Sequence, residues 1–236
     1  MNKRLLYFIC DNKYKDCLLY NLEKFHSLGE NKNIETLCIS PADFLTSNIP
    51  AKHFLILNDF DYKFTAKFMV GRFEKLKSYK SVLYLDCDAI IKKDINPIFD
   101  EIEAQPHKIH AMVEGDDINQ AGEWHKIGNE IFNKNQPAFN AGIFGFCAEM
   151  IYALDPLLDM IAKWRSLAIA DQPIFNKYII EKNIAVGTLN RHCYFHSPIS
   201  SYKKVNKISL QDAAVVHFLG DAYCGKSVER MRAILS

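Results

Sequence analysis

Two carboxylates separated by one residue follow a strongly apolar run. The run Val82–Leu85 leads directly into Asp86 and Asp88, and the chain is apolar again from Ala89. Two carboxylates this close repel each other unless a cation lies between them. Mg²⁺ or Mn²⁺ accepts such oxygen ligands and can also bridge phosphate oxygens. The segment therefore predicts a divalent-cation site; the alternative is that both aspartates are ordinary turn residues at the end of a strand.

Short apolar runs alternate with helical patterns over most of the chain. We expect strands over residues 5–10, 34–40, 53–57, 81–85, 108–113, 141–147 and 213–219, and helices over 14–28, 64–79, 148–167 and 172–182. The polar stretch 114–137 is expected to be an irregular insertion. This alternation is typical of an α/β domain with a mostly parallel sheet. Ligands of such sheets bind at the carboxyl ends of strands, where Asp86 and Asp88 would project.

Composition excludes several classes of protein. The chain has 236 residues, of which 29 are Lys or Arg and 28 are Asp or Glu, so a net charge of +1 gives no basic footprint for nucleic acid. No apolar stretch is long enough for a transmembrane helix, and the run 5–10 is too short for a signal peptide. The seven cysteines form no CxxC pair, which argues against zinc-ribbon and thioredoxin-like proteins. We expect a cytoplasmic protein, and basic clusters at 202–207 and 226–232 leave open a peripheral position at the inner membrane surface.

Five segments together resemble glycosyltransferase family 8, whose members have the GT-A fold. In the order of the family they are Cys10-Asp11-Asn12-Lys13-Tyr14, Leu83–Ile91 with its Asp-x-Asp, Phe139-Asn140-Ala141-Gly142-Ile143-Phe144, Asp171-Gln172, and Val216-His217-Phe218-Leu219-Gly220. The likeness extends over nearly the whole chain. It implies a single Rossmann-like GT-A domain over residues 1–236, and a hexosyltransferase that uses a UDP-sugar donor and a glycan acceptor.

The resemblance also implies roles for individual residues. Asp86, Asp88 and His217 would ligate Mn²⁺ or Mg²⁺ together with the diphosphate of the donor. Further donor contacts would come from Cys10, Asp11, Tyr14, Arg72, Cys87, Glu114, Asn140, Ala141, Gly142, Gly220 and Lys226. Lys67 is the alternative to Arg72, and Asp116 and Asp117 are the alternatives to Glu114. Lys226 would replace the usual phosphate-binding lysine, because Tyr223 occupies that position.

Asp171 and Gln172 are the candidate catalytic residues under the resemblance. Asp171 would hold hydroxyls of the donor sugar, and Gln172 would lie beside the anomeric carbon. Since Pro173 follows them, Asp171 could instead be an N-cap. Family members retain the anomeric configuration, so we expect front-face attack in which the departing phosphate oxygen accepts the proton of the acceptor. Lipopolysaccharide core is one acceptor of the family's bacterial members.

Two other functions stay open on the sequence alone. Haloacid-dehalogenase-type phosphatases also place an apolar run before Asp-x-Asp, and Asp86 would then be the nucleophile, with Phe218-Leu219-Gly220-Asp221 as a metal segment. A non-catalytic GT-A module that binds a nucleotide sugar or a glycan is the second alternative, and the displaced lysine keeps it open.

Overall fold

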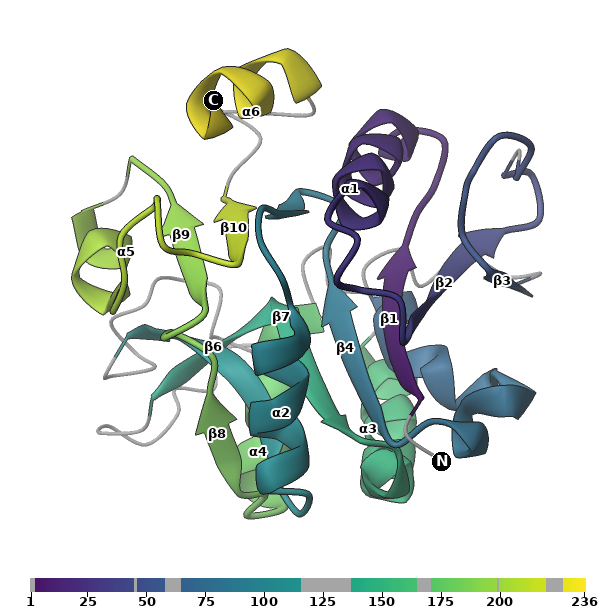
Figure 1. The fold of residues 1–236 in the computed structure, drawn as a ribbon. Coiled ribbons are helices and arrows are strands. Elements are labelled where there is room, and N and C mark those ends of the chain that lie inside the picture. Colours follow the sequence, from purple (N-terminus) through teal and green to yellow (C-terminus); the bar gives the residue numbers. More distant parts are fainter. Residues whose placement is uncertain are drawn as a thin grey trace.

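The computed structural model describes residues 3–44, 46–57, 65–115, 137–164, 171–198, 200–219 and 227–236. These residues form a mixed α/β fold with one large sheet, a smaller sheet beside it, and helices on both faces of the large sheet (Figure 1). The strands are β1 Arg4–Ile9, β2 Ile34–Pro41, β3 His53–Leu57, β4 Ser81–Leu85, β5 Ala89–Ile91, β6 Ile109–Gly115, β7 Ala138–Cys147, β8 Val186–Thr188, β9 Cys193–His196 and β10 Val215–Phe218.

The large sheet has the order β3-β2-β1-β4-β7-β6-β8. Four of its six pairings are parallel; β7 is antiparallel to both β4 and β6. The small sheet has the order β5-β10-β9. β5 begins only a few residues after β4 ends, so one short turn that contains Asp86 and Asp88 connects the two sheets.

The helices cover the large sheet because its strands are apolar on both faces. The helices are α1 Lys15–Ser27, α2 Asn96–Ala104, α3 Ile151–Trp164, α4 Asp171–Glu181, α5 Ser200–Val205 and α6 Val228–Leu235, with 3₁₀ helices η2 Thr65–Arg72, η3 Glu74–Ser78 and η5 Ala148–Met150. Along β1, Leu6 and Phe8 pack with α1 and α2, whereas Leu5 and Tyr7 pack with η2, α3 and α4. This alternation gives two apolar cores, one on each face of the sheet.

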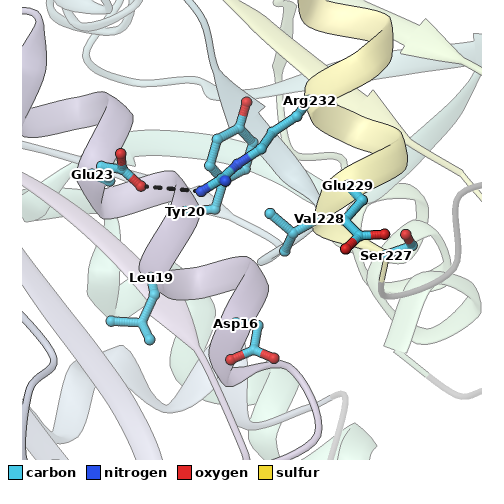
Figure 2. Close-up of a pocket in the computed structure, with 8 residues that line it drawn as sticks. All are labelled: Asp16, Leu19, Tyr20, Glu23, Ser227, Val228, Glu229 and Arg232. Carbon is cyan, nitrogen blue, oxygen red and sulfur yellow. Dashed lines mark hydrogen bonds and ion pairs between the residues drawn. The ribbon is translucent and has the colours of Figure 1, made fainter.

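The C-terminal helix α6 packs on α1 (Figure 1). Arg232 of α6 reaches across to α1, where its guanidinium lies 5.0 Å from the ring centroid of Tyr20 and 3.5 Å from Glu23 Oε2 (Figure 2). A pocket of about 450 Å³ lies between the two helices. The residues that line it include none of the residues predicted above to bind a ligand.

Most of the predicted strands and helices are confirmed, with ends that differ by a few residues. The predicted helix over 64–79 is wrong. Residues 65–72 and 74–78 form the 3₁₀ helices η2 and η3 instead. The backbone N–H groups of Phe73, Leu76 and Tyr79 each donate to the carbonyl three positions earlier, as 3₁₀ winding requires. The sequence analysis also missed α2, α5, α6 and the short strands β5, β8 and β9.

None of the described helices combines the length and the apolar character needed to cross a membrane. The six cysteines among the described residues are all buried and free.

Candidate active site

Asp86, Asp88 and His217 form one cluster at the turn between β4 and β5. Nε2 of His217 lies 3.4 Å from Asp88 Oδ1 and 3.9 Å from Asp86 Oδ2. One ligand atom from each of the three residues lies within 4.8 Å of the others. His217 is almost fully buried, whereas the two carboxylates are each about a third exposed (31% and 30%). Burial alone would lower the pKa of His217, but Asp88 and Asp86 outweigh it and raise that pKa.

The small sheet explains how a histidine so distant in sequence reaches the two aspartates. β10 pairs antiparallel with β5, and His217 lies opposite Ala89 in this ladder. The backbone N–H of Phe218 donates to the carbonyl of Asp88 at 3.1 Å, which extends the pairing into the turn. The imidazole is therefore held beside Asp88 by backbone register and not by side-chain contacts alone.

Gly142 allows the cluster to close against β7. The backbone N–H of Asp86 donates to the Gly142 carbonyl at 2.7 Å. A Cβ at position 142 would lie 2.4 Å from His217 Cε1 and 2.5 Å from Asp86 Oδ2, so any other residue would have to displace these side chains. The register of the β6–β7 ladder shifts between Ala111 and Met112 of β6, which pair with Phe144 and Asn140 of β7, so the ladder skips residues 141–143. Such β-bulges commonly redirect a strand at a functional site.

Lys67 of η2 joins the cluster of Asp86, Asp88 and His217 to the first turn of α4. Its ammonium lies 3.1 Å from Asp86 Oδ1 and 2.9 Å from Asp171 Oδ2, and it donates to the Ala141 carbonyl at 3.0 Å. The side chain is 1% exposed. Burial opposes the charged form, but Asp86 and Asp171 outweigh it and hold the pKa of Lys67 above its ordinary value. A buried lysine with two carboxylate partners stays charged.

A second group of polar side chains surrounds Glu114. Glu114 Oε1 accepts from Asn140 Nδ2 at 2.6 Å, and Glu114 Oε2 accepts from Gln172 Nε2 at 2.7 Å. Oε1 of Gln172 in turn accepts from the backbone N–H of Ala141 at 3.2 Å. Tyr202 of α5 also hydrogen-bonds Glu114, and burial together with the charge of Glu114 raises the pKa of this tyrosine. Glu114 is itself 3% exposed, so it holds other side chains in place more than it faces solvent.

Asn176 fixes α4 against the start of β7. Its Oδ1 accepts from the Phe139 N–H at 2.8 Å, and its Nδ2 donates to the carbonyls of Phe139 at 2.7 Å and Gln172 at 2.9 Å. Asn176 is buried, and its hydrogen bonds fix the position of Asp171 and Gln172 of α4 relative to β7.

The predicted nucleotide segment lies at the end of β1, next to the end of β4 in the sheet. Asp11 Oδ1 accepts from the backbone N–H of Lys13 at 2.9 Å, so Asp11 shapes its own loop, and Tyr14 is half-buried. The thiols of Cys10 and Cys87 are buried. Cys87 Sγ donates to the Ile9 carbonyl at 3.1 Å, which ties the turn after β4 to β1.

Not every predicted site residue is brought together. Arg72, expected to contact the nucleotide sugar, is exposed at the end of η2, whereas the alternative Lys67 lies beside Asp86. The cation that faces the cluster is thus Lys67, and a contact of Arg72 with the donor stays a prediction. The 3₁₀ winding of η2 accounts for the position of Lys67, since it turns this side chain inward with the apolar residues around it. Gly220 and Lys226 lie outside the described residues, as do Asp116, Asp117 and Tyr223.

The sequence analysis missed two residues of this site. Tyr84, in the apolar run before Asp86, donates a hydrogen bond from its hydroxyl to Asp86 Oδ1, and Tyr202 contacts Glu114. The position of Lys67 did point to its role. It is a single lysine inside the run Thr65–Val70, in which every residue is buried, and a buried lysine needs an anionic partner.

The donor set fits a hard divalent cation. Two partly exposed carboxylates and one buried imidazole suit Mn²⁺ and accommodate Mg²⁺, and their open side faces solvent. The space that a Cβ at position 142 would fill borders two of the three ligand side chains. Asp86, Asp88 and His217 are thus the residues that would hold the ion.

Comparison with known proteins decides the family. Residues 24–223 match the model of glycosyl transferase family 8. The chain belongs to this family. Because it belongs to glycosyl transferase family 8, the protein is a glycosyltransferase. The cluster of Asp86, Asp88 and His217 lies at the carboxyl end of its strand β4. No curated protein sequence matches the chain.

Solved structures of glycosyltransferases share the GT-A fold of this family 8 member. The crystal structure of the galactosyltransferase LgtC in complex with donor and acceptor sugar analogs is 16% identical, with a TM-score of 0.66, over 98% of this chain and 94% of LgtC. An active-site mutant of LgtC, with glutamate in place of glutamine, is 15% identical with a TM-score of 0.68 and the same coverage. The bifunctional glycosyltransferase WbbM is 16% identical with a TM-score of 0.66; the match covers 93% of this chain and 46% of WbbM.

Proposed function

We propose that this family 8 glycosyltransferase transfers a hexose from a UDP-sugar to a glycan acceptor, with retention of anomeric configuration. Mn²⁺ or Mg²⁺ would be held by Asp86, Asp88 and His217. The acceptor we favour is a cell-surface glycan of the lipopolysaccharide-core type. The observation that carries the proposal is the convergence of these three ligand side chains next to Lys67, Asp171 and Gln172.

Each part of the site has a task in this reaction. The bound cation would neutralise charge that builds up on the departing diphosphate. The loop after β1, with Asp11 and Tyr14, lies beside the turn that carries Asp86 and is the place where the nucleoside would bind. Asp171, held by Lys67, offers a carboxylate for hydroxyls of the donor sugar.

Gln172 is the candidate for the position beside the anomeric carbon. Its carbonyl oxygen lies on the Asn140–Ala141 side of the site because its amide nitrogen is held by Glu114. As the bond from the anomeric carbon to the phosphate oxygen breaks, the acceptor oxygen bonds to the same face and its proton passes to that phosphate oxygen. Positioning and electrostatics carry the rate in such a step, with no side-chain base required. In LgtC, too, an active-site residue studied by mutation is a glutamine.

A screen of UDP-sugars with Mn²⁺, read out by UDP release, tests the proposal. We expect one UDP-hexose to be consumed, and we expect Asp88→Asn to abolish that reaction. Asp212→Asn is a matched control, because Asp212 is exposed on a loop away from the cluster. Replacing Gln172 by Ala should lower turnover far more than affinity for UDP. Equal losses in turnover and affinity would argue against the role of Gln172.

Membership of family 8 argues against the phosphatase alternative, in which Asp86 would act as nucleophile. Oδ1 of Asp86 is also occupied by hydrogen bonds from Lys67 and Tyr84. If UDP binds tightly while no UDP-sugar in the screen is hydrolysed or transferred, the chain is a binding module instead of an enzyme.

A further inference from the structure

The two carboxylate oxygens of Asp86 have different surroundings. Oδ1 accepts hydrogen bonds from the hydroxyl of Tyr84 and from Lys67 Nζ, the latter at 3.1 Å. Oδ2 faces the imidazole, 3.9 Å from His217 Nε2, and borders the space beside Gly142. One oxygen is thus tied to the protein, and the other points at the remaining metal ligands.

Tyr84 is packed on all sides, and its hydroxyl hydrogen-bonds Asp86. The residue is fully buried, and its ring packs against Tyr7 with centroids 5.0 Å apart and against Phe144 at 5.1 Å. The ammonium of Lys67 lies 4.9 Å from the same ring centroid. The carboxylate of Asp86 can only accept hydrogen bonds, so the hydroxyl of Tyr84 is the donor.

We propose that Tyr84 is a positioning residue for the metal: with Lys67 it engages Oδ1 of Asp86, so that Asp86 presents Oδ2 as its single ligand atom. The inference rests on the proposed function, since it concerns the same cation site. A carboxylate free to rotate would offer either oxygen or both, and the ion would then shift relative to Asp88 and His217. Hydrogen bonds to metal-ligating carboxylates commonly carry a large part of metal affinity.

Tyr84→Phe removes the hydroxyl and keeps the ring. We expect the Kd for Mn²⁺, measured with the metal alone by the loss of the free-ion EPR signal, to rise about tenfold. Tyr79→Phe is the matched control: Tyr79 is also a buried tyrosine whose hydroxyl donates to a carboxylate, but the acceptor is Glu35 Oε2 and not Asp86. We expect its Mn²⁺ affinity to match that of the unsubstituted protein.

The outcomes separate the inference from the proposed function. If the unsubstituted protein binds no Mn²⁺, the proposed metal site is overturned and the role of Tyr84 with it. If the unsubstituted protein binds Mn²⁺ and Tyr84→Phe binds it equally well, only the inference is overturned. An equal loss of affinity in Tyr79→Phe also overturns it, because the cause would then be the loss of any buried tyrosine hydroxyl and not of the bond to Asp86.

A second measurement needs no variant at all. In crystals of the unsubstituted protein soaked with Mn²⁺, we expect Asp86 to ligate the ion through Oδ2 alone while Oδ1 keeps its hydrogen bond to Tyr84. Ligation through Oδ1, or through both oxygens, overturns the inference even if Tyr84→Phe fails to fold.

Discussion

Glu114 Oε2 accepts a hydrogen bond from Gln172 Nε2 at 2.7 Å, and this contact determines which way the amide of Gln172 faces. A carboxylate can only accept hydrogen bonds, so the nitrogen of the amide must point at Glu114 and the oxygen must point away. The oxygen then lies 3.2 Å from the backbone nitrogen of Ala141. The candidate catalytic amide on α4 is therefore oriented by a residue of strand β6.

Replacing Glu114 by Gln should disturb this orientation. A glutamine offers one acceptor atom where the carboxylate offers two, so either Asn140 or Gln172 loses its partner. We expect kcat to fall about a hundredfold, as is usual when a reacting group is misplaced, while the KM for the donor changes much less. Glu149→Gln, on the exposed surface of η5, is the control and should behave as the unsubstituted enzyme. A change in KM with kcat unaltered would refute this role.

Lys67→Met should remove the cation that holds Asp86 and Asp171 together. Leaving two close carboxylates without their buried partner is expected to cost about 3 kcal/mol of unfolding free energy, and activity should be lost. Arg72→Met, five residues along the same 3₁₀ helix but exposed, should change neither by a measurable amount. Urea unfolding and donor turnover of the two variants test this directly. Loss of activity in Arg72→Met alone would restore the first assignment of the nucleotide-sugar contact to Arg72.

Lys67 and Arg72 show which parts of the site the sequence could predict and which it could not. The motif order placed Asp86, Asp88 and His217 in one site. The strand that ends just before Asp86 and the strand that carries His217 were predicted nearly to their ends. The choice between Lys67 and Arg72 depended on how the chain winds between β3 and β4. Apolar residues three apart fit an α-helix as well as a 3₁₀ helix, so the pattern alone does not decide between them.

Contacts made by buried polar side chains were the least predictable part. Tyr84 lies within an apolar strand, where a tyrosine is ordinarily a core residue, and nothing in the spacing shows that its hydroxyl reaches Asp86. Glu114 was predicted to contact the donor sugar, and that role stays a prediction. Its hydrogen bonds to Asn140 and Gln172 join segments 26 and 58 residues away in sequence, and such pairings follow from the fold alone.

Gly142→Ala should weaken metal binding without unfolding the protein. The added methyl would lie 2.4 Å from His217 Cε1 and 2.5 Å from Asp86 Oδ2, so the ligands must move apart. We expect the Kd for Mn²⁺ to rise at least about tenfold. In the control Gly71→Ala, the nearest atom is 3.2 Å away in the flexible side chain of Ile151, and binding should be unchanged. Isothermal titration of both variants with Mn²⁺ gives the comparison; equal Kd values would show that the cluster tolerates the methyl.

Glu103 should make the stability of the protein sensitive to acid. It accepts from Arg4 Nε at 2.9 Å, Lys80 Nζ at 2.8 Å and Ser81 Oγ at 2.6 Å, which ties α2 to the starts of β1 and β4. Burial opposes the charged form, but these donors outweigh it and lower the pKa of Glu103 from 4.5 to about 2. A lowered pKa contributes stability that is complete above pH 4.5 and is lost as the pH falls toward 2.

Glu103→Gln measures that contribution. We expect it to reduce the free energy of unfolding by about 1–2 kcal/mol near neutral pH, and the difference from the unsubstituted protein to shrink as the pH approaches 2. Urea unfolding across this pH range provides the values. A difference that is constant with pH would mean that the carboxylate charge is not responsible.

The central claim is that Asp86, Asp88 and His217 hold one cation on which the diphosphate of the donor binds. Calorimetric titration with UDP, with and without Mn²⁺, tests it most directly when run on the unsubstituted protein, Asp88→Asn and His217→Ala. We predict tight UDP binding to the unsubstituted protein only when Mn²⁺ is present, and no gain from Mn²⁺ in either variant. UDP affinity that is the same with and without the metal, or a metal effect that survives both substitutions, would contradict the claim.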